Sequence, residues 1–194
     1  MKRFGLLPAL ALIAACSQET ADEPAPAVTG SVTSAAAQPA PTPVANRAYR
    51  YTSLEDCKLM RAELGEMPYS EVLCPGPAGW ALRIADADAR QTLGVVAPDA
   101  KETKLDLSRE SGGAFNSFGT TAEWRGPATE PFAPDALIVR FNVAEQPHPA
   151  PEVAYLLAIR LKPLPCLIER VGPGATQNDA ARAAADAGRE CSTR

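Results

Sequence analysis

The chain has 194 residues, of which 46% are hydrophobic, and its formal net charge is −4. This length allows one domain of ordinary size with its own core. The acidic side chains outnumber the basic ones without clustering, which argues against nucleic acid as a partner and favours a cationic partner, if the partner is charged at all.

Residues 1–15 have the layout of a secretory signal peptide. Lys2 and Arg3 form a basic start, and residues 4–15 carry no charged side chain. About 12 apolar residues would span roughly 18 Å as a helix, too short for a bilayer core of about 30 Å. We therefore expect a cleaved signal here rather than a transmembrane helix, and no later stretch of the sequence is long enough for one.

The residues Ile13-Ala14-Ala15-Cys16 resemble the lipobox of bacterial lipoproteins. The resemblance implies that cleavage leaves Cys16 at the start of the mature chain, with a lipid thioether and an acylated amine. Two or more acyl chains anchor a protein stably, whereas one gives marginal binding. Because Ser17 rather than aspartate follows, the resemblance also implies export to the outer membrane, facing the periplasm. The alternative is an ordinary secretory signal with an incidental cysteine.

Residues 16–48 are expected to form a lipidated N-terminus and a disordered tether rich in proline and alanine. Residues 17–48 contain no Leu, Ile, Met or aromatic residue, so they cannot bury enough apolar surface to offset their ordering entropy. A flexible coil of this length spans roughly 30 Å. We predict a spacer that separates the membrane from a single β-rich domain at residues 49–194.

Four cysteines fall in that domain, at Cys57, Cys74, Cys166 and Cys191. An even number in an exported domain suggests disulfides. Of the three possible pairings we favour Cys57–Cys74 and Cys166–Cys191, because short loops close most easily, and each bond would contribute about 3 kcal/mol. Zinc binding is the rival, but the spacing is wrong and the only histidine is His148. We predict no metal site and no cofactor.

Alternating apolar residues predict strands at 80–84, 135–143 and 153–162. Each would place one face on a core and leave the other partly exposed. The expected core-facing residues are Trp80, Leu82, Ile84, Leu137, Val139, Phe141, Val143, Val153, Tyr155, Leu157, Ile159 and Leu161. Weaker strand patterns lie at 91–97, 122–125 and 166–171, and residues 124–139 suggest a hairpin.

Two further segments complete the predicted fold. Residues 54–73 could begin a helix after the capping-box sequence at 53–56, or form two strands, which we favour. The alanine-rich tail predicts a helix with Asn178 as N-cap and with Ala180, Ala184, Ala187 and Cys191 along one side. The predicted fold class is mainly β (α+β): an antiparallel sheet or small barrel-like domain with one C-terminal helix, stabilised by disulfides.

The sequences "YTSLEDC", "CPGPAGW", "DADAR" and "PCLIER", with a helix closing on a cysteine, resemble a group of small exported bacterial proteins of no known activity. The resemblance implies a disulfide-stabilised periplasmic domain. It supplies no catalytic residues.

Few residues of the sequence occur in patterns typical of a catalytic or binding site. His148 lies between prolines in a segment typical of an exposed loop, and no serine sits in a Gly-x-Ser-x-Gly sequence. Asp86 and Asp88, followed by Arg90, could serve an envelope hydrolase, but a polar turn is the favoured interpretation. Phe115 and Phe118 lie in a glycine-containing segment that is either a connecting loop or a contact surface.

The sequence "SGGAF" at 111–115 resembles a loop of membrane-bound lysozyme inhibitors, and the resemblance implies lysozyme inhibition as one alternative function. Our main hypothesis is a non-enzymatic envelope lipoprotein with a binding or structural domain. We expect a membrane contact through the lipid and an envelope protein or glycan as partner. An envelope hydrolase, whose site assembles only in the fold, is the other alternative.

Overall fold

The computed structural model describes residues 46–145 and 151–192. Cys16, the signal sequence, all but the last residues of the tether segment and His148 lie outside the described residues. The elements are β1 (Arg47–Ser53), β2 (Lys58–Glu63), β3 (Tyr69–Pro75), a 3-10 turn (Pro77–Gly79), β4 (Ala81–Ala87), β5 (Arg90–Val96), β6 (Glu102–Leu105), α1 (Ser108–Ser111), β7 (Asn116–Pro127), β8 (Ala136–Ala144), β9 (Glu152–Arg160), β10 (Cys166–Val171) and α2 (Gln177–Asp186).

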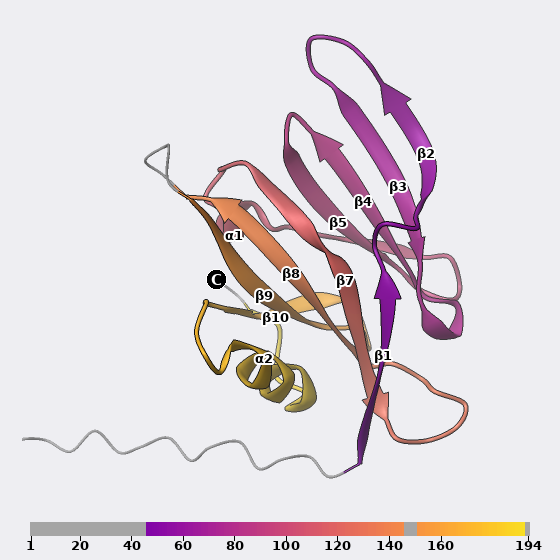
Figure 1. Cartoon of the computed structure of the whole chain (residues 1–194). Helices are drawn as coiled ribbons and strands as arrows, with labels where there is room; N and C mark the ends of the chain where they lie inside the picture. Colours follow the sequence, from indigo (N-terminus) through magenta and orange to yellow (C-terminus); the bar gives the residue numbers. More distant parts are fainter. Residues whose placement is uncertain (1–45, 146–150, 193–194) are drawn as a thin grey trace, which may run out of the picture. The chain divides into compact units, whose positions relative to one another are not determined.

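The predicted fold class is confirmed: the domain is mainly β with one C-terminal helix (Figure 1). Its strands form one sheet in the order β10-β9-β8-β7-β5-β4-β3-β2, with β1 paired to β7 and β6 paired to β5. The two ends of this order are different, unpaired edges, so the sheet is open and not a closed barrel. Every pairing is antiparallel except one residue pair between β5 and β7, Arg90 with Asn116.

That single pair divides the sheet into two halves, one with β2–β6 and the other with β1 and β7–β10. Both halves contribute to one core: Leu82 and Val95 from the first pack in the same buried cluster as Phe141 and Ile159 from the second. The halves therefore pack face to face, and burial of their inner faces is the main stabilising term.

The alternating pattern identified the core correctly. Nearly all the predicted inward residues belong to the main buried cluster or pack against it; Val153 is the exception and is half-buried. The strands at 91–97, 122–125 and 166–171 also form, as β5, part of β7 and β10. Residues 54–73 contain β2 and most of β3, which pair antiparallel, and the hairpin predicted at 124–139 joins β7 to β8.

Two strands were not predicted. β1 starts at Arg47, inside the segment assigned to the tether, and β6 is only four residues long. In β1 the tyrosines alternate with arginine and alanine, and Tyr49 and Tyr51 are each 52% exposed. Its pairing with β7, rather than burial of a face, accounts for this strand.

The helix α2 covers the outer face of β8 and β9, which we had expected to remain partly exposed. Ile138 and Leu156 on that face are buried together with Ala181, Ala184 and Ala185 of the helix. The small side chains of these alanines allow the helix to approach the sheet closely. Figure 1 shows α2 beside the strands of this half.

The expected start and face of this helix were wrong. Thr176, not Asn178, is the N-cap, and Ala180 and Ala187 are exposed. The helix ends at Asp186 and the chain turns at Gly188, where φ is +59°, so Cys191 lies beyond the helix and cannot continue its face.

Both predicted disulfides, Cys57–Cys74 and Cys166–Cys191, are present. The first closes the base of the β2–β3 hairpin, and the second ties the chain after α2 to β10. Within the part of the chain that the structure describes, no helix is long and apolar enough to cross a membrane.

Candidate functional site

A groove of about 470 Å³ runs beside α2 on the helix-covered face of the sheet. Its lining residues come from β1, β7, β8, β9 and α2, and are Tyr51, Gly119, Thr120, Thr121, Glu123, Ile138, Arg140, Leu156, Asn178 and Arg182. The volume lies within the range of small-molecule pockets. We call this hollow the α2 groove.

An irregularity in β7 shapes the groove. Phe118 pairs with Phe141 and Ala122 with Val139. Three residues of β7 therefore lie between these two pairs, where β8 has only one. The extra residues bulge, as strands often do beside binding sites, and expose Thr120 and Thr121.

Gly119 makes room for Arg140. A Cβ atom at position 119 would lie 2.9 Å from the Arg140 Cβ and 3.3 Å from its Cδ. Only the missing side chain lets the stem of Arg140 lie against the backbone of β7. The sequence therefore fixes the position of one guanidinium through a glycine on the neighbouring strand.

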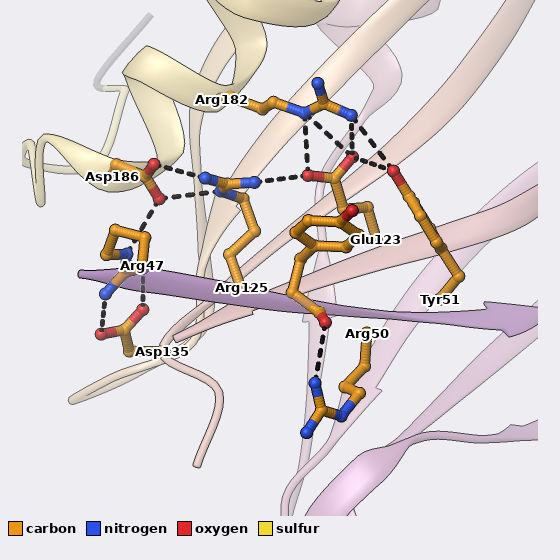
Figure 2. Close-up of polar contacts among 9 residues, drawn as sticks. Arg47, Arg50, Tyr51, Glu123, Arg125, Asp135, Arg182 and Asp186 are labelled. Carbon is orange, nitrogen blue, oxygen red and sulfur yellow. Dashed lines mark hydrogen bonds and ion pairs between the residues drawn. The ribbon is translucent and has the colours of Figure 1, made fainter. Parts of the chain in front are cut away.

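A chain of charged residues, which we call the charge network, lies beside the groove and contributes Glu123 and Arg182 to its lining (Figure 2). It consists of Arg47, Glu123, Arg125, Asp135, Arg182 and Asp186. Arg125 donates to Asp186 Oδ1 at 2.8 Å and also to Glu123, and Arg182 Nε donates to Glu123 Oε1 at 3.0 Å. These bonds connect β7 to α2.

The network extends to both ends of β1. Arg47 Nε donates to Asp186 at 3.0 Å, and its Nη1 donates to Asp135 at 2.8 Å. Arg182 Nη2 donates to the Tyr51 hydroxyl at 3.1 Å, and that hydroxyl donates to Glu123 at 3.3 Å. The first strand is thereby fastened to the last helix.

Burial and pairing act in opposite directions on the two inner carboxylates. Burial alone would raise the pKa of Glu123, but hydrogen bonds from Arg182 and Arg125 outweigh it and hold the pKa below its ordinary value. The pKa of Asp186 is lowered in the same way, since bonds from Arg125 and Arg47 outweigh burial. Both groups are ionised at neutral pH.

Arg140 differs from the other arginines of the groove. The charge network contains three guanidinium groups and three carboxylates, so it balances its own charge. Arg140 is half-buried and has no ion-pair or hydrogen-bond partner within residues 46–145 and 151–192. The groove thus carries one uncompensated positive charge.

This arrangement suits binding better than proton transfer. Glu123, the carboxylate of the groove, accepts hydrogen bonds from two guanidinium groups and a hydroxyl. A general base needs a pKa near the working pH and a free lone pair. In Glu123 the ion pairs lower the pKa and the hydrogen bonds occupy the lone pairs. A free guanidinium, by contrast, is a ready partner for an anion.

The residues selected from the sequence lie elsewhere. Asp86 accepts from Gln91 at 3.1 Å, and Asp88 pairs with Arg90 at 2.7 Å. Asp88 and Ala89 both have positive φ, so they form the tight turn between β4 and β5. The turn interpretation is therefore the correct one, and each carboxylate has a different partner.

Phe115 and Phe118 do not form one exposed patch. Phe115 is 46% exposed, with the Arg90 guanidinium 4.5 Å from its ring centre. Phe118 is half-buried and packs on Phe141 of the core, 5.3 Å between ring centres. Lysozyme inhibition, which was inferred from this segment, stays a prediction.

Sequence reasoning missed the α2 groove. In the sequence, Arg140 was a polar residue on the outer face of a predicted strand, where charged residues normally meet solvent, and Glu123 lay in the weak strand pattern at 122–125. In the described ranges no group of three or more His, Cys, Asp or Glu side chains is placed to hold a metal ion.

Comparisons of the chain with protein-family models, curated proteins and solved structures gave no match.

Proposed function

We propose that this protein is a bacterial cell-envelope lipoprotein whose β domain binds an anionic ligand in the α2 groove without transforming it. A lipid on Cys16 would hold it to the membrane, and residues 17–46 would act as the spacer. The two disulfides favour an oxidising, exported compartment, which is consistent with this proposal.

The observation that carries the binding role is the uncommitted Arg140. Arg140 is half-buried, and none of its nitrogen atoms is among the fully buried polar atoms that lack a hydrogen-bond partner in the described chain, so water can reach its guanidinium. An anionic ligand would supply the missing partner. The overall negative charge of the chain had suggested a cationic partner, but the local charge of the groove favours an anion.

Arginine side-chain NMR tests the binding role directly. In the protein purified from membranes in detergent, we expect acetate or inorganic phosphate to shift the Arg140 Nε–Hε resonance. Arg61 on β2 is the matched control, since it is exposed, forms an ion pair with Glu63 and lies over the Tyr69 ring. If neither anion shifts the Arg140 signal more than the Arg61 signal, the proposed binding role is wrong.

The anchoring role needs its own experiment. We expect the mature N-terminal peptide to carry the mass of an acylated Cys16, and the protein to move from the membrane to the soluble fraction in Cys16→Ala. An unmodified Cys16 would contradict the lipoprotein assignment while leaving the groove unaffected.

The non-enzymatic part is tested by assays of the purified protein on peptidoglycan and on model esters. We expect no turnover. Hydrolysis that is lost in Asp86→Ala or Asp88→Ala, but kept in a variant of an exposed residue such as Glu63→Ala, would establish the hydrolase alternative instead.

A further inference from the structure

The charge of the α2 groove restricts the ligand to one anionic group. Because the charge network is balanced internally, Arg140 alone remains to be neutralised. A doubly charged phosphate monoester would leave one negative charge without a partner in the groove. A carboxylate carries one charge and matches the planar fork of a guanidinium with two parallel hydrogen bonds.

Apolar surface lies directly beside this guanidinium. Leu156 is the cross-strand partner of Arg140, and Ile138 is two residues away on the same face of β8. Both side chains line the groove and have only 6% and 5% of their surface exposed. A ligand held by Arg140 would therefore place an apolar group next to its carboxylate.

The remaining wall offers hydrogen-bonding groups. The side chains of Thr120, Thr121 and Asn178 line the groove, and none of them hydrogen-bonds to another group of the described chain. Hydroxyl and amide groups can both donate and accept, so they can pair with the N–H and C=O of a peptide backbone.

A carboxylate, an adjacent apolar side chain and backbone amides occur together at the C-terminus of a peptide. We propose that the α2 groove binds the C-terminal carboxylate of a short peptide whose last residue has a small apolar side chain. This inference rests on the proposed anion-binding function and names its ligand class. Arg140 binds the carboxylate, Ile138 and Leu156 contact the side chain, and Thr120, Thr121 and Asn178 bind the backbone.

Isothermal titration calorimetry of the full chain in detergent tests the inference with N-acetyl-Ala-Ala-Ala and its C-terminal amide. Loss of a charge-assisted, two-bond contact weakens binding by about tenfold or more, so we expect the acid to bind at least that much more tightly than the amide. We expect Arg140→Gln to remove the preference, Arg140→Lys to keep part of it, and Arg61→Gln to leave it unchanged.

The outcomes separate the two proposals. Equal affinity for acid and amide, or a preference that survives Arg140→Gln, overturns the peptide inference. If phosphate or acetate shifts the Arg140 resonance but the tripeptide acid does not bind, the inference fails and the anion-binding function stands. If neither acetate nor phosphate shifts the Arg140 resonance and the tripeptide acid does not bind, the peptide inference and the anion-binding function both fail. Because Arg140 has no partner within the described chain, we expect Arg140→Gln to keep the thermal unfolding midpoint of the parent protein.

Discussion

At the residue scale, the charge network decides how β1, β7 and α2 are held together. Glu123 and Arg125 have only 9% and 7% of their surface exposed, so each would lose much of its hydration without a partner. The network replaces that hydration with hydrogen bonds from groups on other elements. Removal of a buried member such as Glu123 would therefore take a hydrogen-bond partner from a buried arginine.

Replacing Glu123 by alanine is expected to lower the free energy of unfolding by about 2–4 kcal/mol, because Arg125 and Arg182 would lose a shared carboxylate in a dehydrated site. Urea denaturation measures the loss. Glu63→Ala, which breaks the exposed pair with Arg61, is the matched control, and we expect a much smaller loss there because solvent screens that pair. Equal losses in the two variants would mean that burial does not strengthen the network.

Stability should also depend on pH through the same residues. The pKa values of Glu123 and Asp186 are lower in the folded protein than in the unfolded chain, so the unfolded state binds protons first as the pH falls. Their stabilising contribution is complete well above pH of about 4, the unfolded-state value, and is lost as the pH falls through the folded-state values.

We therefore expect the free energy of unfolding to be nearly constant from about pH 7 to pH 5 and to decline below about pH 4. Urea denaturation over this range measures the decline, and the slope should be shallower in Glu123→Gln. An unchanged slope in that variant would show that other carboxylates cause the acid sensitivity.

A third prediction concerns Gly119, the residue that makes room for Arg140. In Gly119→Ala the new methyl group would meet the Arg140 stem at 2.9 Å, so the guanidinium must move. We expect affinity for the carboxylate tripeptide to fall about tenfold, with a stability loss of about 1–3 kcal/mol. Gly65→Ala is the control, because no atom lies within 4 Å of a Cβ added there, and both quantities should stay unchanged.

The residue scale is also where sequence-based prediction failed. Arg125 meets Asp186, which is 61 positions away in the chain, and Arg47 meets the same carboxylate across 139 positions. Local spacing contains no information about such pairs. The sequence also could not show that Arg140 has no ion-pair partner in the described chain, because that depends on which charged residues the fold brings near it.

At the element scale, α2 has two tasks: it covers the outer face of β8 and β9, and it supplies Asn178 and Arg182 to the groove. The Cys166–Cys191 bond fastens the chain just beyond this helix to β10. The other disulfide, Cys57–Cys74, fastens β2, whose residues are all exposed, to a core strand. Both bonds thus hold elements at the margins of the core.

Removing Cys166–Cys191 should therefore affect α2 more than the sheet. In the double variant Cys166→Ala/Cys191→Ala we expect a stability loss of about 3 kcal/mol and faster amide hydrogen exchange throughout α2. Tripeptide affinity should fall as well, since Asn178 of α2 would be less firmly placed. The Cys57→Ala/Cys74→Ala variant is the comparison, and its faster exchange should be confined to the β2–β3 hairpin.

The elements were predicted well where the hydrophobic period was strong. β4, β8 and β9 show clean alternation, because one face of each lies on the main core. β1 lacks that pattern since its tyrosines are half-exposed, and it was missed. The helix was found from its alanines, but its face was not, since alanine covers nearly every side of α2 and does not indicate which side meets the sheet.

At the scale of the whole molecule, the domain consists of two sheet halves around one core, with α2 outside the second half. The fold class followed from the sequence because alternation, turn residues and an even number of cysteines all indicated the same architecture. The order of the strands in the sheet could not be predicted from the sequence. It depends on non-local pairings, such as β1 with β7, that no short motif specifies.

The attachment of β1 has a mechanical consequence. The chain preceding residue 46 is continuous with this strand, so any pulling force transmitted from that side reaches Arg47 first. Arg47 is clamped by Asp135 on the β7–β8 connection and by Asp186 on α2, and the rest of β1 is paired along β7. The force would thus be shared between β7, the longest strand, and α2 before it could separate β1 from the sheet.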